Sequence, residues 1–353
     1  MSRFLQLHLL TFFPPANLNR DDTGRPKTAV VGGATRLRLS SQALKRAWRE
    51  SPVFATALAG HIGQRTQRIG EVVLAHLRDG GMAEGKALSV AREIAAVFGK
   101  VKDIKNDNPA QTEQLAFISP EERAAALAVA DQALKGEKID ITPASLLRGT
   151  DTAADIALFG RMLADNPNFN REAAAQVAHA ITTHKVTVED DYYTAVDDLK
   201  TKADDAGAGF LGEAAFGSGV FYLYLCIDRA LLVRNLGGDT ALAATALAAM
   251  AEAAATTAPR GKQNSFAAHG RAGYVLAERG NQQPRTLAGA FAQPITGEDL
   301  MAASITTLET FRAAIDRAYG PAADTSIDMR VGGERGLQDI VAFVREDFPC
   351  PAI

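Results

Sequence analysis

The sequence predicts an α+β protein in which a sheet domain carries two large insertions. Short apolar segments with strand composition occur along the chain, the clearest at residues 4–12 and 220–227. An alanine-rich stretch with helical periodicity fills residues 55–137. Within residues 186–216, two short strand-like patches flank the polar, glycine-containing segment 200–209, which is typical of a projecting hairpin.

The amino-terminal elements follow from local signals. After the first strand, residues 14–35 are rich in proline, glycine and polar side chains and are expected to form a loop. The alternating residues 36–39, Arg-Leu-Arg-Leu, predict a short strand. A helix should then begin at Ser40 or Ser41, both favourable N-caps, and end near Glu50.

The later elements are predicted in the same way. Ser119 followed by proline and two glutamates predicts a helix over about residues 120–135. Residues 140–164 have strand-like composition, and residues 240–256 are expected to form a buried helix. A further strand, centred on residues 274–276, is expected within the next apolar segment.

Composition limits the class of protein. The chain has 353 residues, of which 47% are hydrophobic and 22% charged, and these values exclude a largely disordered protein. Cys226 and Cys350 cannot form a disulfide framework, and no apolar run reaches the ~20 residues of a membrane span. Because Gln6 and His8 interrupt the first apolar run, a strand is favoured over a signal peptide, and we expect a cytoplasmic protein.

Positive charge is concentrated near the amino terminus, although the formal net charge of the chain is −3. Between residues 16 and 49 only Asp21 and Asp22 are acidic. The basic residues of this segment are Arg20, Arg25, Lys27, Arg36, Arg38, Lys45, Arg46 and Arg49. Such a local excess is typical of a surface that contacts phosphates.

The predicted helix after Ser40 divides its side chains between two faces. Gln42, Lys45 and Arg49 share one face, and the opposite stripe of Leu44, Ala47 and Trp48 should face the core. The basic face could be an ordinary solvated surface or an anion-binding surface, and the concentrated charge favours the second. Since Lys45 and Arg49 point away from the core stripe, we expect their charges to be removable without loss of the fold.

Several separated segments together resemble a known family. They are Leu18-Asn19-Arg20-Asp21-Asp22, Gly32-Gly33, residues 38–47 from Arg38 to Ala47, His179-Ala180-Ile181-Thr182-Thr183-His184, Thr194-Ala195-Val196-Asp197-Asp198-Leu199 and Gly217-Ser218-Gly219-Val220-Phe221-Tyr222. The chain resembles the CasC family, the repeated backbone subunit of the type I-E CRISPR surveillance complex Cascade. The resemblance extends from residue 1 to about residue 270.

The resemblance implies a particular fold. This is a modified RRM-like (ferredoxin-like) palm with a helical fingers insertion and a protruding thumb hairpin. Mapped onto this chain, the palm would comprise residues 1–54, 139–185 and 217–353. The fingers would be residues 55–138 and the thumb residues 186–216.

The resemblance also implies partners. About six copies would polymerise head to tail along a CRISPR RNA, and each thumb would reach its neighbour and kink the RNA at regular intervals. Further partners would be the target DNA strand paired to the guide and the guide-end-capping, large and small Cascade subunits. No catalytic residue, metal, cofactor or membrane contact is implied.

The resemblance places candidate site residues at named positions. RNA-backbone contacts are implied for Arg20, Lys27, Ser40, Gln42, Lys45 and Arg49. Kink-forming contacts are implied for Met162, Tyr192, Tyr193, Thr194 and Leu211. Arg46 from the basic segment, and Lys262 and Gln263 from a loop that matches the family, complete the candidate RNA-binding set. Without the resemblance, Met162 would be read as a core residue.

Two other functions remain open on the residues themselves. A metal-dependent RNA endonuclease could use Asp21 or Asp22, although adjacent carboxylates diverge and would more simply cap a turn or hold the Arg20 guanidinium. His179 and His184, five residues apart, do not share a helix face or a strand face and are expected to be structural. The remaining alternative is a structural oligomer without nucleic acid, which would leave the basic segment unexplained.

Overall fold

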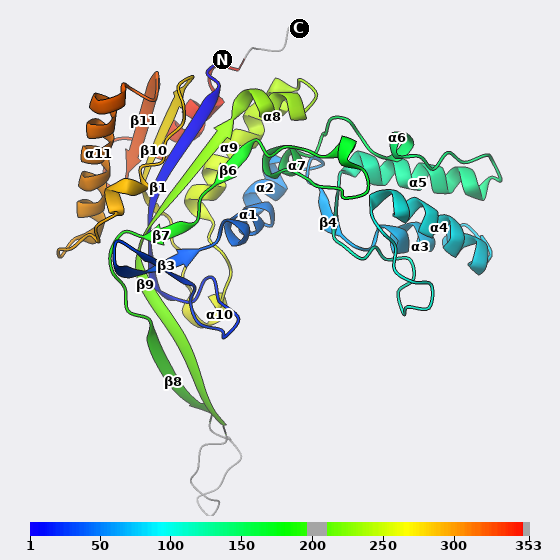
Figure 1. Cartoon of the computed structure of the whole chain (residues 1–353), viewed down its shortest axis with the longest axis horizontal. Coiled ribbons are helices and arrows are strands. Elements are labelled where there is room, and N and C mark those ends of the chain that lie inside the picture. The colour runs from blue at the N-terminus through cyan, green and yellow to red at the C-terminus, as the bar shows by residue number, and fades with distance from the viewer. Residues whose placement is uncertain (196–209, 349–353) are drawn as a thin grey trace, which may run out of the picture.

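The computed structural model describes residues 1–195 and 210–348, and Figure 1 shows their arrangement. The centre of the fold is an antiparallel sheet with the strand order β11-β10-β1-β9-β7-β3-β2, and β6 and β8 also pair with β9. In chain order its strands are β1 (Phe4–Ala16), β2 (Thr28–Val31), β3 (Ala34–Leu39), β6 (Ala175–Val177), β7 (Ala180–Thr182), β8 (Glu189–Ala195), β9 (Phe210–Asp228), β10 (Ala272–Gly280) and β11 (Thr325–Arg330). The chain is therefore a mixed α/β protein built on an antiparallel sheet, and the RRM-like description of that sheet stays a prediction.

The first strand lies in the middle of the sheet, because β1 pairs with β10 on one side and with β9 on the other. Leu5, Leu7 and Leu9 belong to the core on one face of the sheet. Leu10 belongs to a second core on the opposite face. A strand buried on both faces needs apolar residues without strict alternation, which explains the run over residues 4–12. That predicted strand is confirmed and continues to Ala16.

Helices cover both faces of the sheet (Figure 1). The larger core, which includes Trp48, Leu247 and Val344, lies beneath the helices of one face. Those helices are α1 (Ser41–Arg49), α2 (Pro52–Ala57), α7 (Ala154–Phe159), α8 (Arg229–Asn235), α9 (Thr240–Thr256) and α12 (Leu337–Arg345). The smaller core lies beneath η2 (Ala288–Phe291) and α11 (Leu300–Tyr319). The helix predicted over residues 240–256 is thus confirmed as α9.

A helical lobe stands beside the sheet domain, with a core of its own that includes Val73, Ile94 and Ala130. Its elements are β4 (Gln64–Thr66), α3 (Ile69–Asp79), α4 (Glu84–Phe98), β5 (Ala116–Ile118), α5 (Pro120–Leu134) and α6 (Pro143–Leu146). Helix α5 begins where the sequence predicts, because Ser119 and Glu122 form a reciprocal capping box. The division of the chain into palm, fingers and thumb segments stays a prediction.

Two sequence-based expectations about local structure are wrong. The loop expected over residues 14–35 contains the end of β1 and the edge strand β2. The strand-like segment 140–164 instead contains helix α7, in which Ile156, Ala157 and Leu158 are all buried. A short apolar run that is buried on every side lacks the polar residues that distinguish a helical from an extended period.

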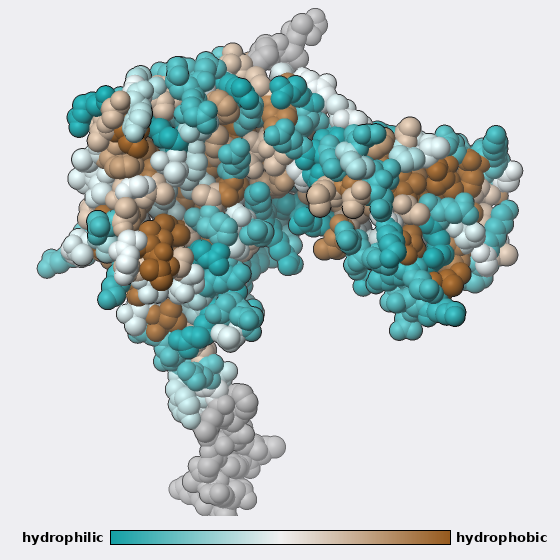
Figure 2. Space-filling model, viewed as in Figure 1, coloured by the Kyte–Doolittle hydropathy of each residue, from teal (hydrophilic) through white to brown (hydrophobic). Residues whose placement is uncertain are grey.

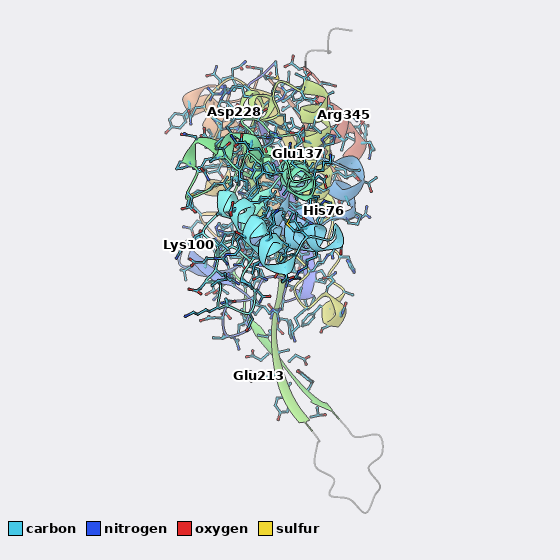
Figure 3. The ribbon with its side chains drawn as sticks, turned by 90° about the vertical axis from the view of Figure 1, so that its right-hand side faces the viewer. His76, Lys100, Glu137, Glu213, Asp228 and Arg345 are labelled. Atoms are coloured by element: carbon cyan, nitrogen blue, oxygen red, sulfur yellow. The ribbon has the colours of Figure 1, made fainter. Side chains whose placement is uncertain are left out.

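The predicted hairpin is confirmed in its described part. Strand β8 pairs with the start of β9, and the pair projects away from the body of the protein (Figures 1 and 3). The connecting residues 196–209 lie outside the described part of the chain. Among the described helices, none is both long enough and apolar enough to cross a lipid bilayer.

Candidate nucleic-acid interface

Helix α1 has the two faces that its sequence predicts. The Ser40 hydroxyl accepts a hydrogen bond from the Ala43 backbone N–H at 3.3 Å, which fixes the start of the helix. The core stripe comprises Leu44, Ala47 and Trp48, all buried. The indole N–H of Trp48 donates to the Thr257 carbonyl at 3.2 Å, so this helix cannot rotate about its axis without losing a partly buried hydrogen bond. Its basic face is thereby held toward the helical lobe.

A groove of about 530 Å³ lies along that basic face. Its lining residues are Gln42, Lys45, Arg46, Arg49 and Glu50 from α1, its C-cap included, and Arg65, Leu115, Phe117, Phe159 and Gly160 from β4, β5 and the end of α7. Figure 2 shows hydrophilic side chains on both sides of the space between the sheet domain and the lobe. A groove lined by both cations and aromatic rings suits a strand that carries both phosphates and bases.

Lys45 is the clearest anion-binding side chain in the groove. Its ammonium lies 5.6 Å from the centre of the Phe159 ring, and within the described residues it forms no ion pair. Burial, together with the nearby charge of Arg65, lowers the pKa of Lys45. Two cations held close without a carboxylate between them repel one another, and a phosphate would remove that repulsion. Arg65 is a groove residue that the sequence-based analysis missed.

Arg49 differs from Lys45 because it is bonded within the protein. Its Nε donates to Asp155 at 2.8 Å, and the Asp155 side chain is fully buried. The guanidinium also donates to the Gly63 carbonyl at 3.3 Å and lies 4.3 Å from the centre of the Phe117 ring. These bonds argue against the expectation that its charge could be removed without loss of the fold, and that expectation stays a prediction. An unpaired Asp155 would remain in the interior.

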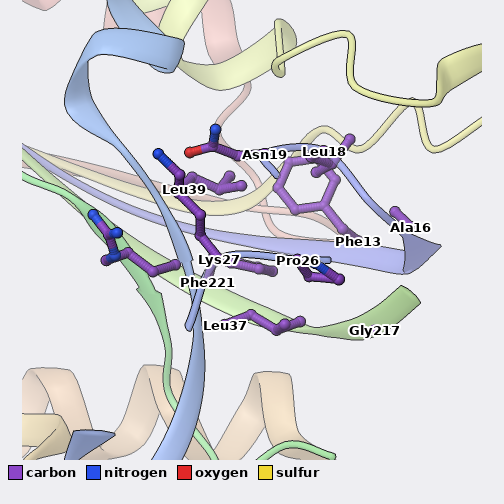
Figure 4. A pocket seen from close by; sticks show the side chains of 11 residues that line it. Phe13, Ala16, Leu18, Asn19, Pro26, Lys27, Leu37, Leu39, Gly217 and Phe221 are labelled. Carbon is purple, nitrogen blue, oxygen red and sulfur yellow. The ribbon is translucent and has the colours of Figure 1, made fainter. Parts of the chain in front are cut away.

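A second group of cations lies at the start of α1. The loop after β1 is held there by three hydrogen bonds, from Lys27 N to Asn19 O at 2.9 Å, from Arg38 N to Lys27 O at 2.8 Å and from Ser40 N to Asn19 Oδ1 at 2.8 Å. Lys27 and Arg38 also line a small pocket whose walls are mostly apolar side chains of β1, β3 and β9 (Figure 4). The backbones of Lys27 and Arg38 are thus held near Ser40, at the start of the helix whose basic face lines the groove.

Other members of the basic segment are bonded within the fold. Arg36 is fully buried and donates to the Thr182 carbonyl at 2.8 Å and to the Phe291 carbonyl at 3.1 Å. Arg25 pairs with Asp190 at 2.7 Å, and the exposed Arg46 pairs with Glu50 one helical turn away. Arg20 is exposed, and its backbone pairs with that of Pro26. The cationic surface is therefore narrower than the sequence count indicates.

The candidate residues of the hairpin lie on β8, apart from Leu211, which lies on β9. Tyr192 is 66% exposed and Tyr193 44% exposed, and adjacent positions on a strand face opposite sides. A Cβ atom at Gly212 would lie only 2.4 Å from the Tyr193 ring, so glycine there lets that ring lie across the neighbouring strand. The Thr194 backbone pairs with that of Leu211, whose side chain lies outside the described ones.

Three further candidates are not among the residues that line the groove. Met162 is 79% exposed, so a core role is wrong for it. The backbone before it is fixed by pairing of Arg161 with Arg171 and by a buried ion pair of Arg161 with Glu122 at 2.6 Å. The other two candidates belong to the loop around the short helix α10 (Gln263–Phe266): Lys262 lines a separate pocket of about 230 Å³, and Gln263 is partly buried beside it.

Asp21 has a structural task in the loop before β2. Its Oδ1 accepts hydrogen bonds from Thr23 N at 2.9 Å, Thr23 Oγ1 at 2.8 Å and Arg25 N at 3.0 Å. The bond from the Thr23 hydroxyl, followed by the backbone bonds, lowers the pKa of Asp21. The prediction that Asp21 caps a turn is confirmed, whereas no described contact joins it to the Arg20 guanidinium. Across residues 1–195 and 210–348, no cluster of three metal-ligating side chains occurs.

Comparisons with known proteins agree with one another. The profile of the CT1975-like protein family matches residues 5–339. A solved structure described as "CRISPR RNA-guided surveillance complex, pre-nicking" has a chain with 29% sequence identity and a TM-score of 0.85, covering 97% of this chain and 100% of that one. Another, described as "CRISPR RNA-guided surveillance complex", has 25% identity and a TM-score of 0.73, covering 96% and 99%. A search of curated proteins gave no match. Because the family profile spans nearly the whole sequence, this chain belongs to the CT1975-like protein family.

Proposed function

We propose that this chain is a non-catalytic CRISPR RNA-binding subunit of a Cascade surveillance complex. The observation that carries the proposal is the pair Lys45 and Arg65, which face one groove without an ion-pair partner among the described residues. The two similar chains of solved structures, both from CRISPR RNA-guided surveillance complexes, support it. The groove would hold guide phosphates beside α1.

The chemistry of the groove fits RNA of any sequence. Lysine and arginine neutralise phosphates without reading bases, and aromatic rings stack on every base alike. A guide-binding subunit needs this tolerance, since base pairing between guide and target supplies the specificity. Met162 and the β8 tyrosines are exposed apolar or aromatic side chains that could enter the base stack.

We further propose that the subunit is of the type I-E backbone kind. About six copies would associate head to tail along the guide, with the hairpin of one copy reaching the next. The assembly would carry the target DNA strand and the guide-end-capping, large and small subunits in the cytoplasm. The projection of the β8–β9 hairpin from the body supports such a contact.

Removing the two unpaired groove charges should weaken RNA binding and its salt dependence. For K45Q/R65Q we expect the slope of log affinity against log salt to become shallower by about two, since each contacting cation contributes about one. Fluorescence anisotropy with unrelated single-stranded RNAs measures this, and wild-type affinity should be nearly independent of sequence.

The matched control is K86Q/R123Q, which removes the same charge from exposed positions of the helical lobe and should leave the slope unchanged. An unchanged slope in K45Q/R65Q would refute the groove assignment.

The endonuclease alternative makes a different prediction, namely Mg²⁺-dependent cleavage of RNA that is lost in D21N. The bonds from Thr23 and Arg25 to Asp21 count against it.

Shortening Tyr192 should abolish regular kinking of the RNA while leaving the fold intact. In Y192A, chemical probing of guide RNA in the assembled complex should lose its periodic pattern of reactive nucleotides, because no ring is left to separate neighbouring bases. Y319A, which removes a tyrosine that is 88% exposed on α11, should retain the pattern. Retention of the pattern in Y192A would remove Tyr192 from the kink.

A further inference from the structure

His179 is held in an unusual way at the edge of the basic surface. It lies between β6 and β7, is exposed, and its Nδ1 is 2.8 Å from Arg38 Nη1. A guanidinium can only donate, so Nδ1 must accept, and the neutral ring carries its proton on Nε2. No described residue bonds to that Nε2, so the ring presents a free N–H donor.

His184 provides the contrast within the same segment. Its Nδ1 is 2.9 Å from the Lys185 carbonyl, and its Nε2 accepts from the Val220 backbone N–H at 3.2 Å. Both ring nitrogens are therefore used by the backbone, as expected for a structural histidine. The prediction that both histidines are structural is supported for His184 alone.

The charges around His179 are all of one sign. Partial desolvation of the ring, and then the positive charges of Arg38 on β3 and Lys27 in the loop before β2, lower the pKa of His179. Within the described residues, no carboxylate pairs with Lys27 or Arg38. Histidine in proteins is usually bonded to a carboxylate or a carbonyl. The His179 ring is instead bonded to one cation and lies near a second, and no negative group among the described residues balances these two positive charges.

We propose that His179, Arg38 and Lys27 form one phosphate-binding site for the RNA strand, and that the site takes up a proton when the phosphate arrives. The inference rests on the proposed function. Hydrogen bonds through Asn19 and Ser40 place this site next to the start of α1, so a strand in the groove would continue across it. A phosphate oxygen would accept a hydrogen bond from the Nε2–H group of His179, and its negative charge would favour the protonated imidazolium. Since Nδ1 of the imidazolium also carries a proton, it can no longer accept from Arg38, whose N–H would turn toward the phosphate.

The direct test follows the His179 ring by NMR in the full chain, free and bound to a single-stranded oligouridine. We expect the pKa of His179 to lie below its ordinary value in the free protein and to rise on binding. In parallel, wild-type affinity for the RNA should increase as the pH falls from about 7.5 to about 6.0. The increase should be up to about tenfold for each unit by which binding raises the pKa of His179. Calorimetry in two buffers of different ionisation enthalpy should show proton uptake.

The variant H179Q keeps a side-chain donor without a titrating group, so its affinity should be independent of pH over this range and its proton uptake lost. H269Q, at another exposed histidine, should behave as the wild type. Proton uptake that persists in H179Q, or an NMR pKa that is unchanged on binding, would overturn the inference while leaving the groove intact. Wild-type protein that binds no RNA at any pH would instead overturn both this inference and the proposed function.

Discussion

Replacing Arg49 with methionine is expected to lower the free energy of unfolding by about 3–5 kcal/mol, the usual result of removing one partner of a buried ion pair. The fully buried Asp155 would lose the guanidinium, whose Nε lies 2.8 Å away, and only its backbone hydrogen bonds from Gly63 and Ile156 would remain. Urea unfolding followed by circular dichroism measures the change. K45M, which removes the neighbouring charge without such a partner, should change stability by less than about 1 kcal/mol.

The loss in R49M should also depend on pH with a definite sign. Burial raises the pKa of Asp155, and Arg49 counteracts this rise. Without Arg49 the folded-state pKa would rise further above that of the unfolded chain. The free energy of unfolding of R49M would then fall as the pH rises from the unfolded-state pKa of Asp155 to its folded-state pKa. The difference in stability between R49M and wild type should therefore be smaller near pH 5 than near pH 8. A small deficit that is equal at both pH values would show that Arg49 is a surface cation, as the sequence-based analysis assumed.

Arg49 and Lys45 therefore report different properties, although the sequence places them on one helix face. Arg49 joins α1 to Asp155 on α7 and to the Gly63 carbonyl just before β4, and so ties the groove wall to the helical lobe. Lys45 has no such bond and can be changed to probe anion binding. A double variant at both positions would lose affinity through unfolding as well as through charge, and it could not separate the two causes.

Helix α1 and the hairpin were predictable because their signals are local. The Ser40 cap and the spacing of Leu44 and Trp48 lie within three turns of one helix, and the two patches around residues 200–209 are close in the chain. The basic segment was also visible as a concentration of charge. What the sequence could not show was which of its cations are free to meet a ligand.

Arg36 and Arg38 illustrate that limit. Strand alternation places them on one face, yet Arg36 is fully buried while Arg38 reaches His179. The difference depends on the Thr182 and Phe291 carbonyls, which are 146 and 255 positions away in the sequence. The groove residue Arg65 was missed for the same reason, because only the pairing of β4 with β5 places it opposite Lys45. Long-range contacts decide the composition of the site.

The second large effect is expected at Glu278, which lies on β10 beneath α11 and is fully buried. Its carboxylate pairs with Arg285 at 2.6 Å and with Arg312 at 2.8 Å, and it accepts from His8 Nε2 at 3.2 Å. His8 in turn is 2.8 Å from the Tyr222 hydroxyl. Burial lowers the pKa of His8, so the neutral ring takes part as a hydrogen-bond donor. Glu278 thereby joins β1, β10 and α11.

The variant E278Q should lose about 3–5 kcal/mol of stability at pH 7, because two arginines would be left around a neutral amide in the interior. E309Q is the matched control. Glu309 also pairs with an arginine, Arg330 at 2.9 Å, but its side chain is 43% exposed, so its loss should cost no more than about 1 kcal/mol. Urea unfolding of both variants measures the difference, and equal small losses would contradict the buried-network account.

Acid titration separates the charge of Glu278 from its packing. Although burial alone would raise it, the hydrogen bonds from His8 and Arg285 and the charges around the carboxylate lower the pKa of Glu278 far below its ordinary value. A depressed folded-state pKa gives a contribution that is complete above the unfolded-state value of about 4.3 and declines as the pH falls below it. The gap between wild type and E278Q should therefore be constant from about pH 7 to about pH 5 and narrow toward pH 3. A gap that stays constant to pH 3 would mean that the glutamine disturbs packing, because a lost charge interaction must fade as the unfolded chain takes up the proton.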